Sequence, residues 1–272
     1  MKTIVAALIF AGATLARADV PATFETEPFR APTAGSTRAA DSLIIAGQID
    51  RVYPASGGGG SVDWLHASVN GATLSGGVAS YALGDSRWTF GRAGGAARLD
   101  DRFLVHGQAS LGGGRTADSH FAYRLFSAGA FYGISPTTYL KGEDQYVDIG
   151  TTRGHLLKAG IAFLPLRDVT VDIGYARSAG GNLNSEFVAT RVDWQTRYGR
   201  ILGGLALGRS VRDLFNIDVG SGKPNADLRE LFVGVAVPIA RAELTIVIDV
   251  LGFEEVRRRT LTLSLKVPLR DV

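Results

Sequence analysis

Apolar and polar side chains alternate one by one over segments of about ten residues, and this period of two constrains the fold most. Near the end of the chain, Leu244, Ile246 and Ile248 alternate with Thr245 and Asp249. Successive side chains of a strand point to opposite faces of its sheet, so each segment has one apolar and one polar wall. The pattern therefore predicts an all-β protein.

Fourteen such segments follow Leu43, separated by clusters of Gly, Asp, Asn, Ser and Pro. They cover approximately residues 43–53, 61–69, 72–82, 86–98, 102–112, 119–133, 138–149, 155–164, 168–178, 185–198, 200–211, 228–239, 243–252 and 257–267.

Segment length and the charges on the polar faces distinguish a membrane barrel from a soluble β-sandwich, which also alternates, and the alternation of short and long connections is a third sign. The segments are about as long as the 9–11 residues that cross a bilayer at a tilt. Their polar faces carry Asp, Glu, Lys and Arg at mid-strand, which suits a wet lumen. No stretch after residue 19 holds 18 consecutive apolar residues, which excludes a helical membrane protein. We predict a transmembrane antiparallel up-and-down β-barrel of fourteen strands, with twelve or sixteen as alternatives.

Connection lengths predict how the barrel is oriented. Short turns are expected at the periplasmic end, at 70–71, 99–101, 135–136, 165–167, 199 and 240–242. The intervening connections are mostly longer and are expected to face outward, at 54–60, 84–85, 113–118, 150–154, 179–184, 212–227 and 253–256. Short periplasmic turns with longer outer loops are typical of outer-membrane barrels.

The first residues have the features of a secretory signal. Lys2 precedes an apolar stretch from Ile4 to Leu15, and Ala16-Arg17-Ala18 fits a cleavage site. We predict a cleaved signal peptide at 1–18, a periplasmic N-terminal lead-in at 19–41 and an outer-membrane barrel at 42–272. The formal charge of +3 includes Lys2 and Arg17, so cleavage leaves 3 − 2 = +1, which gives no reason to expect a nucleic-acid partner.

Candidate catalytic and cofactor motifs are weak. The chain has no Cys, and its four His lack metal-ligand spacing. Gly220-Ser221-Gly222-Lys223 departs from the phosphate-loop pattern at Ile217 and Pro224, and Gly57–Gly60 is expected to be loop glycine. Ser119 and His120, with His106 on an adjacent segment, leave an outer-membrane lipid hydrolase as an alternative. We expect no enzyme activity and no catalytic, cofactor or metal site.

The polar faces predict the residues that line the lumen. Both signs of charge occur in similar number, whereas a selective ion channel usually carries a ring of one sign. The expected pore-lining residues are Gln48, Asp50, His106, Gln108, Arg124, Lys141, Glu143, Gln145, Lys158, Asp172, Arg191, Asp193, Gln195, Arg197, Glu243, Asp249 and Lys266.

Several aromatic residues have two interpretations each. Phe126 and Tyr132 are expected on the inward face, where they would stack on sugar rings, fill the lumen, or turn to lipid at a bulge. Trp88, Tyr146, Trp194 and Tyr198 lie near segment ends, and are either interface-girdle residues or ordinary packing.

Order and spacing over most of 43–212 resemble the YaiO-type outer-membrane barrel family. The resemblance lies in Ile134–Gly142, where a Pro136 turn opens a strand, in Gly160–Phe163, in Asp172–Tyr175, and in the stretch from Ile45 to Tyr53. It implies a bacterial outer-membrane barrel associated with surface polysaccharide, with any synthesis or export partners on separate chains.

The expected function is a passive outer-membrane pore or export conduit for a polysaccharide or another hydrophilic solute, in contact with outer-membrane lipid. A general small-solute porin is the first alternative. The lipid hydrolase and a structural or adhesion barrel that binds through 212–227 are the others.

Overall fold

The computed structural model describes residues 8–10, 28–30, 40–52, 55–67, 72–210, 226–253 and 256–269. The predicted signal peptide and lead-in lie almost wholly outside these residues and stay predictions. The Gly220–Lys223 motif and nearly all of the predicted 212–227 loop also lie outside them. Within the described part of the chain, no helix is long and apolar enough to cross a membrane.

Every described element is a strand. The strands are β1 (Leu8–Phe10), β2 (Pro28–Arg30), β3 (Ala40–Val52), β4 (Ala55–Ala67), β5 (Thr73–Leu83), β6 (Ser86–Arg98), β7 (Phe103–Arg115), β8 (His120–Ser135), β9 (Thr138–Ile149), β10 (Thr152–Leu166), β11 (Val169–Ala179), β12 (Glu186–Thr196), β13 (Gly199–Ser210), β14 (Ala226–Ile239), β15 (Ala242–Phe253) and β16 (Val256–Pro268).

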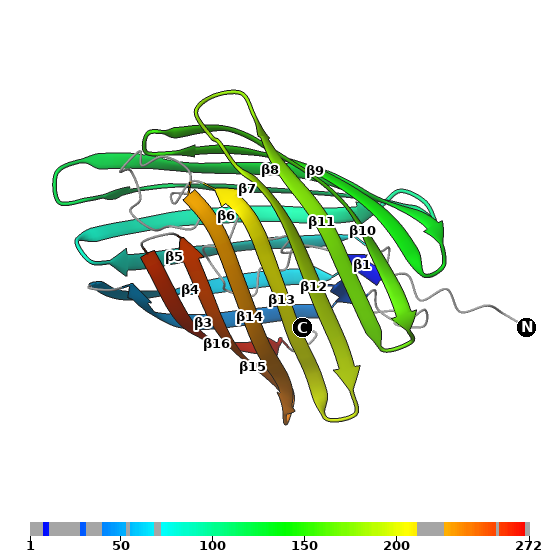
Figure 1. Ribbon diagram of the computed structural model, residues 1–272. Helices are drawn as coiled ribbons and strands as arrows, with labels where there is room; N and C mark the ends of the chain where they lie inside the picture. Colours follow the sequence, from blue (N-terminus) through cyan, green and yellow to red (C-terminus); the bar gives the residue numbers. More distant parts are fainter. Residues whose placement is uncertain are drawn as a thin grey trace, which may run out of the picture.

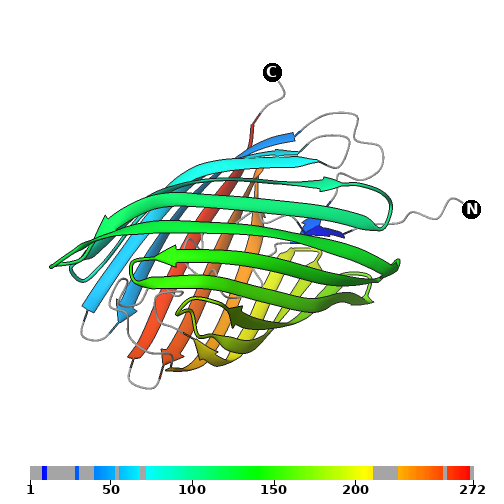
Figure 2. The same cartoon turned by 90° about the horizontal axis from the view of Figure 1, so that it is seen from above.

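Strands β3 to β16 form one closed antiparallel barrel in which each strand pairs with the next along the chain. The circle closes where β16 pairs with β3, with Pro268 opposite Ser42 and Arg258 opposite Val52. The prediction of fourteen antiparallel strands is confirmed. Figure 1 shows the strands of the near wall crossing those of the far wall obliquely, and Figure 2 shows the same crossing from above. This is the tilt that closing a sheet into a barrel requires.

The two ends of the barrel differ less than connection lengths predicted, because four of the seven connections at the end where β3 ends also have two residues. At the end where β3 begins and β16 ends, four of the six connections have two residues, for example 136–137 between β8 and β9. We call this the turn end. The opposite end carries the longest connection, 211–225 between β13 and β14, and we call it the loop end.

One predicted loop is wrong. Residues Pro54–Gly60 were expected to form an outward loop, but Gly57–Gly60 lie inside β4 and pair with both β3 and β5. Their missing side chains make room for neighbours, because a Cβ on Gly59 would collide with the ring of Tyr81. The glycine run is therefore part of the barrel wall. A neighbouring side chain approaches its backbone closely, which is a usual reason for glycine inside a strand.

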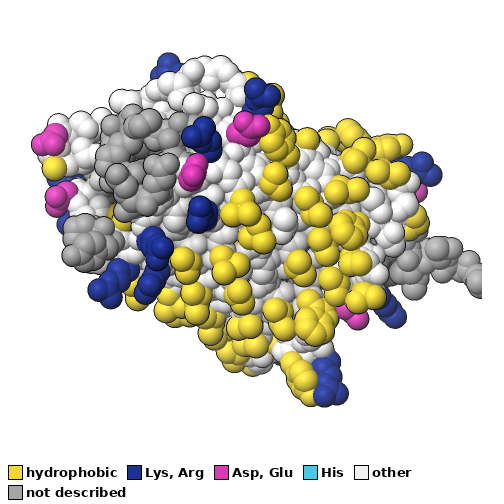
Figure 3. Space-filling view, viewed as in Figure 1, with side chains coloured by type: hydrophobic (Ala, Val, Ile, Leu, Met, Phe, Trp, Pro, Cys, Tyr) yellow, Lys and Arg dark blue, Asp and Glu magenta, His cyan; other side chains and the backbone are white. Residues whose placement is uncertain are grey.

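The alternation predicted from the sequence separates an inner from an outer face. On β3, Ile44 is 3% exposed whereas its neighbour Ile45 is 47% exposed. Large apolar side chains are exposed on the outer face of every barrel strand but β6, and Figure 3 shows them covering the middle of the visible wall, with Lys and Arg toward its ends. Side chains that point into the barrel are largely buried.

Candidate functional site

The interior of the barrel is divided into an apolar and a polar zone. At the loop end, apolar and aromatic side chains from ten strands and the β11–β12 connection form one cluster, which we call the apolar layer. Its members are Ala79, Tyr81, Trp88, Phe90, Phe121, Tyr123, Leu125, Val147, Ile149, Leu156, Ala176, Leu183, Phe187, Ala189, Ala206, Leu228, Leu251 and Phe253.

Aromatic rings stack along one side of the apolar layer. Phe90 and Tyr123 have ring centroids 4.6 Å apart and nearly parallel planes, and Tyr81 stacks with Trp88 at 5.9 Å. Tyr123 and Phe187, on β8 and β12, are each only 1% exposed. A side chain beside a water-filled channel would keep some exposed surface, so no such channel borders these two side chains.

We call the charged part of the interior the polar belt. It lies mostly between the apolar layer and the turn end, although Glu230 and Arg258 lie opposite Leu251 of the layer. A second, smaller apolar cluster of Leu202, Phe232 and Val247 also lies inside the barrel. The charged and histidine side chains of the belt point inward, and acids and bases occur in similar number, as predicted. They are Asp50, Asp63, Arg92, His106, Lys141, Glu143, Lys158, Asp172, Arg191, Asp193, Arg200, Glu230, Asp249 and Arg258.

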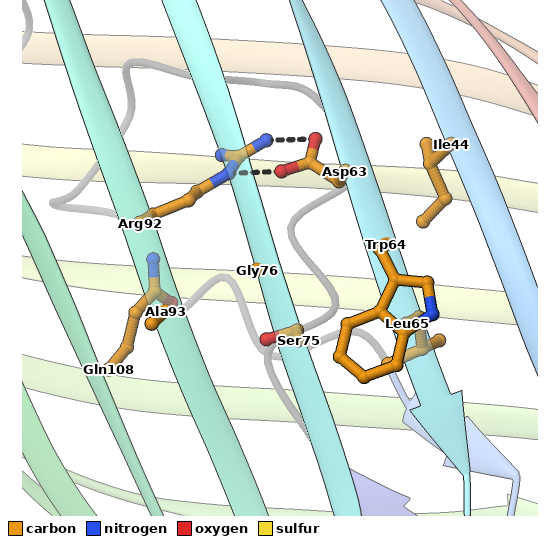
Figure 4. Close-up of a pocket in the computed structure, with 9 residues that line it drawn as sticks. All are labelled: Ile44, Asp63, Trp64, Leu65, Ser75, Gly76, Arg92, Ala93 and Gln108. Atoms are coloured by element: carbon orange, nitrogen blue, oxygen red, sulfur yellow. Dashed lines mark hydrogen bonds and ion pairs between the residues drawn. The ribbon is translucent and has the colours of Figure 1, made fainter.

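Oppositely charged residues of the belt meet across an intervening strand. Asp63 on β4 and Arg92 on β6 both lie opposite Gly77 on β5. The guanidinium of Arg92 donates to both carboxylate oxygens of Asp63, with 2.5 Å between Nε and Oδ1. Figure 4 shows the two side chains pointing toward each other across β5. A Cβ on Gly77 would occupy the space of the Asp63 carboxylate, so the glycine is what allows the pair to form.

Two further pairs repeat this arrangement. Lys141 on β9 forms an ion pair with Asp172 on β11, and its side chain passes over Gly160 on β10. His106 on β7 lies 3.9 Å from Glu143 on β9, over Gly129 on β8.

Further contacts extend these pairs into a network. Glu143 also accepts from Lys158 at 2.7 Å, and Arg200 contacts both Asp193, at 3.6 Å, and Glu243, at 3.2 Å. Buried charges are costly unless paired and hydrogen-bonded, which explains why the belt is neutralised pair by pair.

Of the seventeen residues predicted to line the pore, fifteen have inward-facing side chains. The two exceptions are Arg124 and Arg197. Arg124 is on the outer face, where its side chain is 54% exposed and contacts Asp148 at 3.3 Å. Arg197 lies in the turn between β12 and β13, exposed, with its guanidinium 4.4 Å from the ring centre of Tyr198. Both predictions are wrong, because charge indicates the inner face only where the outer face meets hydrocarbon, and these residues lie toward the ends of the wall.

Two aromatic predictions are also corrected, and the choice between two interpretations is decided for a third residue. Phe126 and Tyr132 point outward and are 41% and 47% exposed, because the inward positions of β8 are the odd-numbered ones. Of the two interpretations of Trp88, packing is the one that holds, because its side chain is 4% exposed inside the apolar layer and not in an outer girdle. The indole Nε1 of Trp88 has no hydrogen-bond acceptor among the described residues.

The serine and histidines of the hydrolase alternative are not assembled. His106 pairs with Gly129 inside the barrel, whereas His120 pairs with Arg115 on the outer face at the loop end. Ser119 is bonded to Thr116 at 2.9 Å, and no hydrogen bond joins it to His120 in the described structure. No group of three potential metal ligands occurs among the described residues.

Sequence reasoning missed Asp63, Arg92, Arg200, Glu230 and Arg258 of the belt. The glycine-rich strands β4 to β6 weaken the alternation around the first two. An inward Arg or Asp opposite a glycine was the available signal, but it becomes visible only once the register is known.

These features define a closed fourteen-stranded barrel with a layered interior, of the class found in outer-membrane channels. No protein-family model and no curated protein matches the sequence. The fold resembles the CymD monoaromatic hydrocarbon channel at 9% identity and a TM-score of 0.59, over 84% of this chain and 87% of that one.

Two other solved structures share the fold. The Pseudomonas putida toluene transporter TodX is 9% identical, with a TM-score of 0.58 over 97% of this chain and 94% of its own. A bacterial polysaccharide outer membrane secretin is 10% identical, with a TM-score of 0.51 over 85% of this chain and 98% of its own. At such identities the likeness concerns the fold.

Proposed function

We propose that the barrel lies in the outer membrane of a Gram-negative bacterium and acts as a passive, normally closed channel for small molecules with an apolar part. The exposed outer wall supports the membrane location. Ile49, Val78 and Ile248 are 68%, 59% and 58% exposed and belong to a band that continues around the barrel. Exposing such an apolar band to water costs free energy, which contact with lipid avoids. The closed sheet also leaves no strand edge without backbone hydrogen bonds in hydrocarbon.

The apolar layer carries the proposal about the solute. A hydrated ion or sugar would have to lose water to pass side chains such as Tyr123 and Phe187, which is costly without new hydrogen bonds. An alkyl or aromatic group gains contacts there instead. The Nε1–H of Trp88, which has no acceptor among the residues that the structure describes, offers one donor to an acceptor on such a molecule.

The names of the structural neighbours agree with this solute class. CymD and TodX are described as a monoaromatic hydrocarbon channel and a toluene transporter. Small aromatic molecules are accordingly the first substrates to test.

A polysaccharide conduit is the second candidate, with synthesis or export proteins on separate chains. The polar belt favours it, because paired charges can exchange partners with hydroxyl groups. The resemblance to the YaiO-type family and the fold shared with the polysaccharide secretin support it as well.

Uptake by intact Gram-negative cells separates the two candidates. Cells that carry the barrel should take up the apolar dye N-phenyl-1-naphthylamine faster than cells without it, while proteoliposomes should not swell in oligosaccharide solutions. Replacement Leu228→Arg should place a charge in the apolar layer and abolish dye uptake. Swelling by oligosaccharides with unchanged dye entry would favour the polysaccharide conduit instead.

Cell fractionation tests the membrane location separately. The mature chain should sediment with outer membranes and require detergent for extraction. Recovery in the aqueous fraction without detergent would refute both channel proposals.

A further inference from the structure

Ten arginines lie on the outer face of the wall near the loop end and are exposed. They come from nine of the fourteen barrel strands, while acids are fewer on the same part of the wall. The ten are Arg51, Arg87, Arg115, Arg124, Arg153, Arg177, Arg209, Arg229, Arg257 and Arg259.

Some of these arginines have acidic partners on the wall. Asp148 accepts from Arg124 at 3.3 Å and from Arg153 at 3.2 Å, and Arg209 lies 3.5 Å from Asp227. These three arginines share two acids, so most of their positive charge is balanced within the protein.

Arg87 and Arg115 differ, because they lie directly opposite each other on β6 and β7. His120 on β8 continues the same row, opposite Arg115. Within the described structure, neither arginine forms an ion pair, including with the exposed Asp85 and Asp118 of the adjoining connections. Like charges directly opposite each other in a sheet are destabilising unless an anion lies between them.

A hollow of about 450 Å³ lies at this place on the rim. Arg87, Arg115, His120 and Thr89 contribute polar side chains to it, and Gly113 leaves it open. Guanidinium groups bind phosphate through two parallel N–H donors, which makes paired arginines a strong phosphate site. The hollow opens widely to the outside, so a phosphate and its sugar would lie on the rim and not be enclosed.

The hollow is also correctly placed for a lipid. Leu111, 51% exposed on the outer face of β7, is four residues from Arg115, which is about 13 Å along a strand. An acyl chain beside Leu111 would therefore bring its headgroup to the level of Arg115. The loop end faces the cell exterior in the usual orientation of such barrels.

We propose that Arg87, Arg115 and His120 bind the phosphate monoester of a phosphorylated outer-leaflet glycolipid. This inference uses the membrane location proposed above, but not the identity of the transported solute. The bound lipid would separate the two facing guanidinium groups by neutralising them.

The test compares lipids on the purified full-length barrel in uncharged detergent. Diphosphorylated lipid A should bind in native mass spectrometry and raise the midpoint of thermal unfolding, whereas enzymatically dephosphorylated lipid A should not. The double variant R87Q/R115Q should weaken lipid A binding about tenfold or more, because two charge-assisted contacts are lost. The matched double variant R124Q/R153Q, at the same end but facing Asp148, should change binding less than about twofold.

The outcomes decide between the sources of phosphate. Equal stabilisation by inorganic phosphate at the same concentration would show a phosphate site but overturn its assignment to lipid. Equal binding of phosphorylated and dephosphorylated lipid A to the unaltered protein would overturn the proposal without any variant. Failure of dye uptake would leave this result unaffected, since lipid binding is measured on the isolated barrel.

Discussion

At the residue scale, glycines decide which charged side chains meet inside the barrel. Gly77 lies between Asp63 and Arg92, and Gly160 lies beside the path from Lys141 to Asp172. Nearest strands in a sheet are about 4.8 Å apart, so a residue two strands away is reached only by a long side chain over an empty position. Long basic residues and glycines thus act together to neutralise the polar belt.

Replacement Gly77→Ala should lower the free energy of unfolding by about 1–3 kcal/mol, because its Cβ displaces the Asp63 carboxylate. Gly76→Ala is the matched control on the same strand, since its Cβ would meet only the Arg92 carbonyl oxygen, at 3.7 Å. It should change stability by at most about 0.5 kcal/mol. Urea unfolding in detergent measures both, and equal losses would contradict the bridging role of Gly77.

Replacement Arg92→Met should destabilise the barrel by about 3–5 kcal/mol, because Asp63 is left buried without its main partner. The double variant D63L/R92M should recover most of this loss, since no uncompensated charge remains. Arg209→Gln, which breaks the exposed pair with Asp227, should cost less than about 1 kcal/mol. The interpretation fails if the double variant is no more stable than R92M.

At the scale of strands, each strand has an inner and an outer face, and the polarity of these faces changes along the strand. On β8, Tyr123 points into the apolar layer and Phe126 points outward. Both faces of this strand are rich in apolar residues, so alternation of polarity does not show which face is inside. The charged side chains gather toward the middle of the interior, while apolar ones are buried at the loop end and again toward the turn end, for example Phe131 and Tyr139. The simple rule of polar-inside therefore fails away from the middle.

Replacement Tyr123→Ala should raise ion conductance in planar bilayers, because it removes a ring from the layer that closes the lumen. It should also destabilise the barrel by about 3–5 kcal/mol, as aromatic deletions in packed interiors do. Phe126→Ala, on the outer face of the same strand, should leave conductance unchanged. Equal conductance of both variants and the unaltered protein would show that the apolar layer is not the barrier.

At the scale of the whole molecule, stability depends on closure. Every strand from β3 to β16 has two partners, and the seam between β16 and β3 involves residues separated by most of the chain. A closed ladder has no edge to pair with other chains or to remain unsatisfied in lipid. The barrel should therefore unfold as one unit.

Deletion of residues 256–272, which removes β16, should abolish the folded barrel, because β15 and β3 would become unpaired edges. The unaltered protein should migrate faster in SDS gels before boiling than after it, and the deleted form should show one migration only. A deletion of 213–223, between β13 and β14, should keep the difference. Retention of the heat-dependent shift without β16 would contradict closure as the source of stability.

The sequence by itself determined the fourteen strands and most of their bounds, because a period of two and turn residues are local properties of the chain. It also placed most belt residues inside, since their charges exclude them from the middle of an apolar outer wall. The tertiary structure alone decided which charges pair, because Asp63 and Arg92 are 29 residues apart and meet only through the register of three strands. It also decided that the loop end is apolar within and rich in arginine outside, because this polarity depends on the position of each residue along the closed barrel.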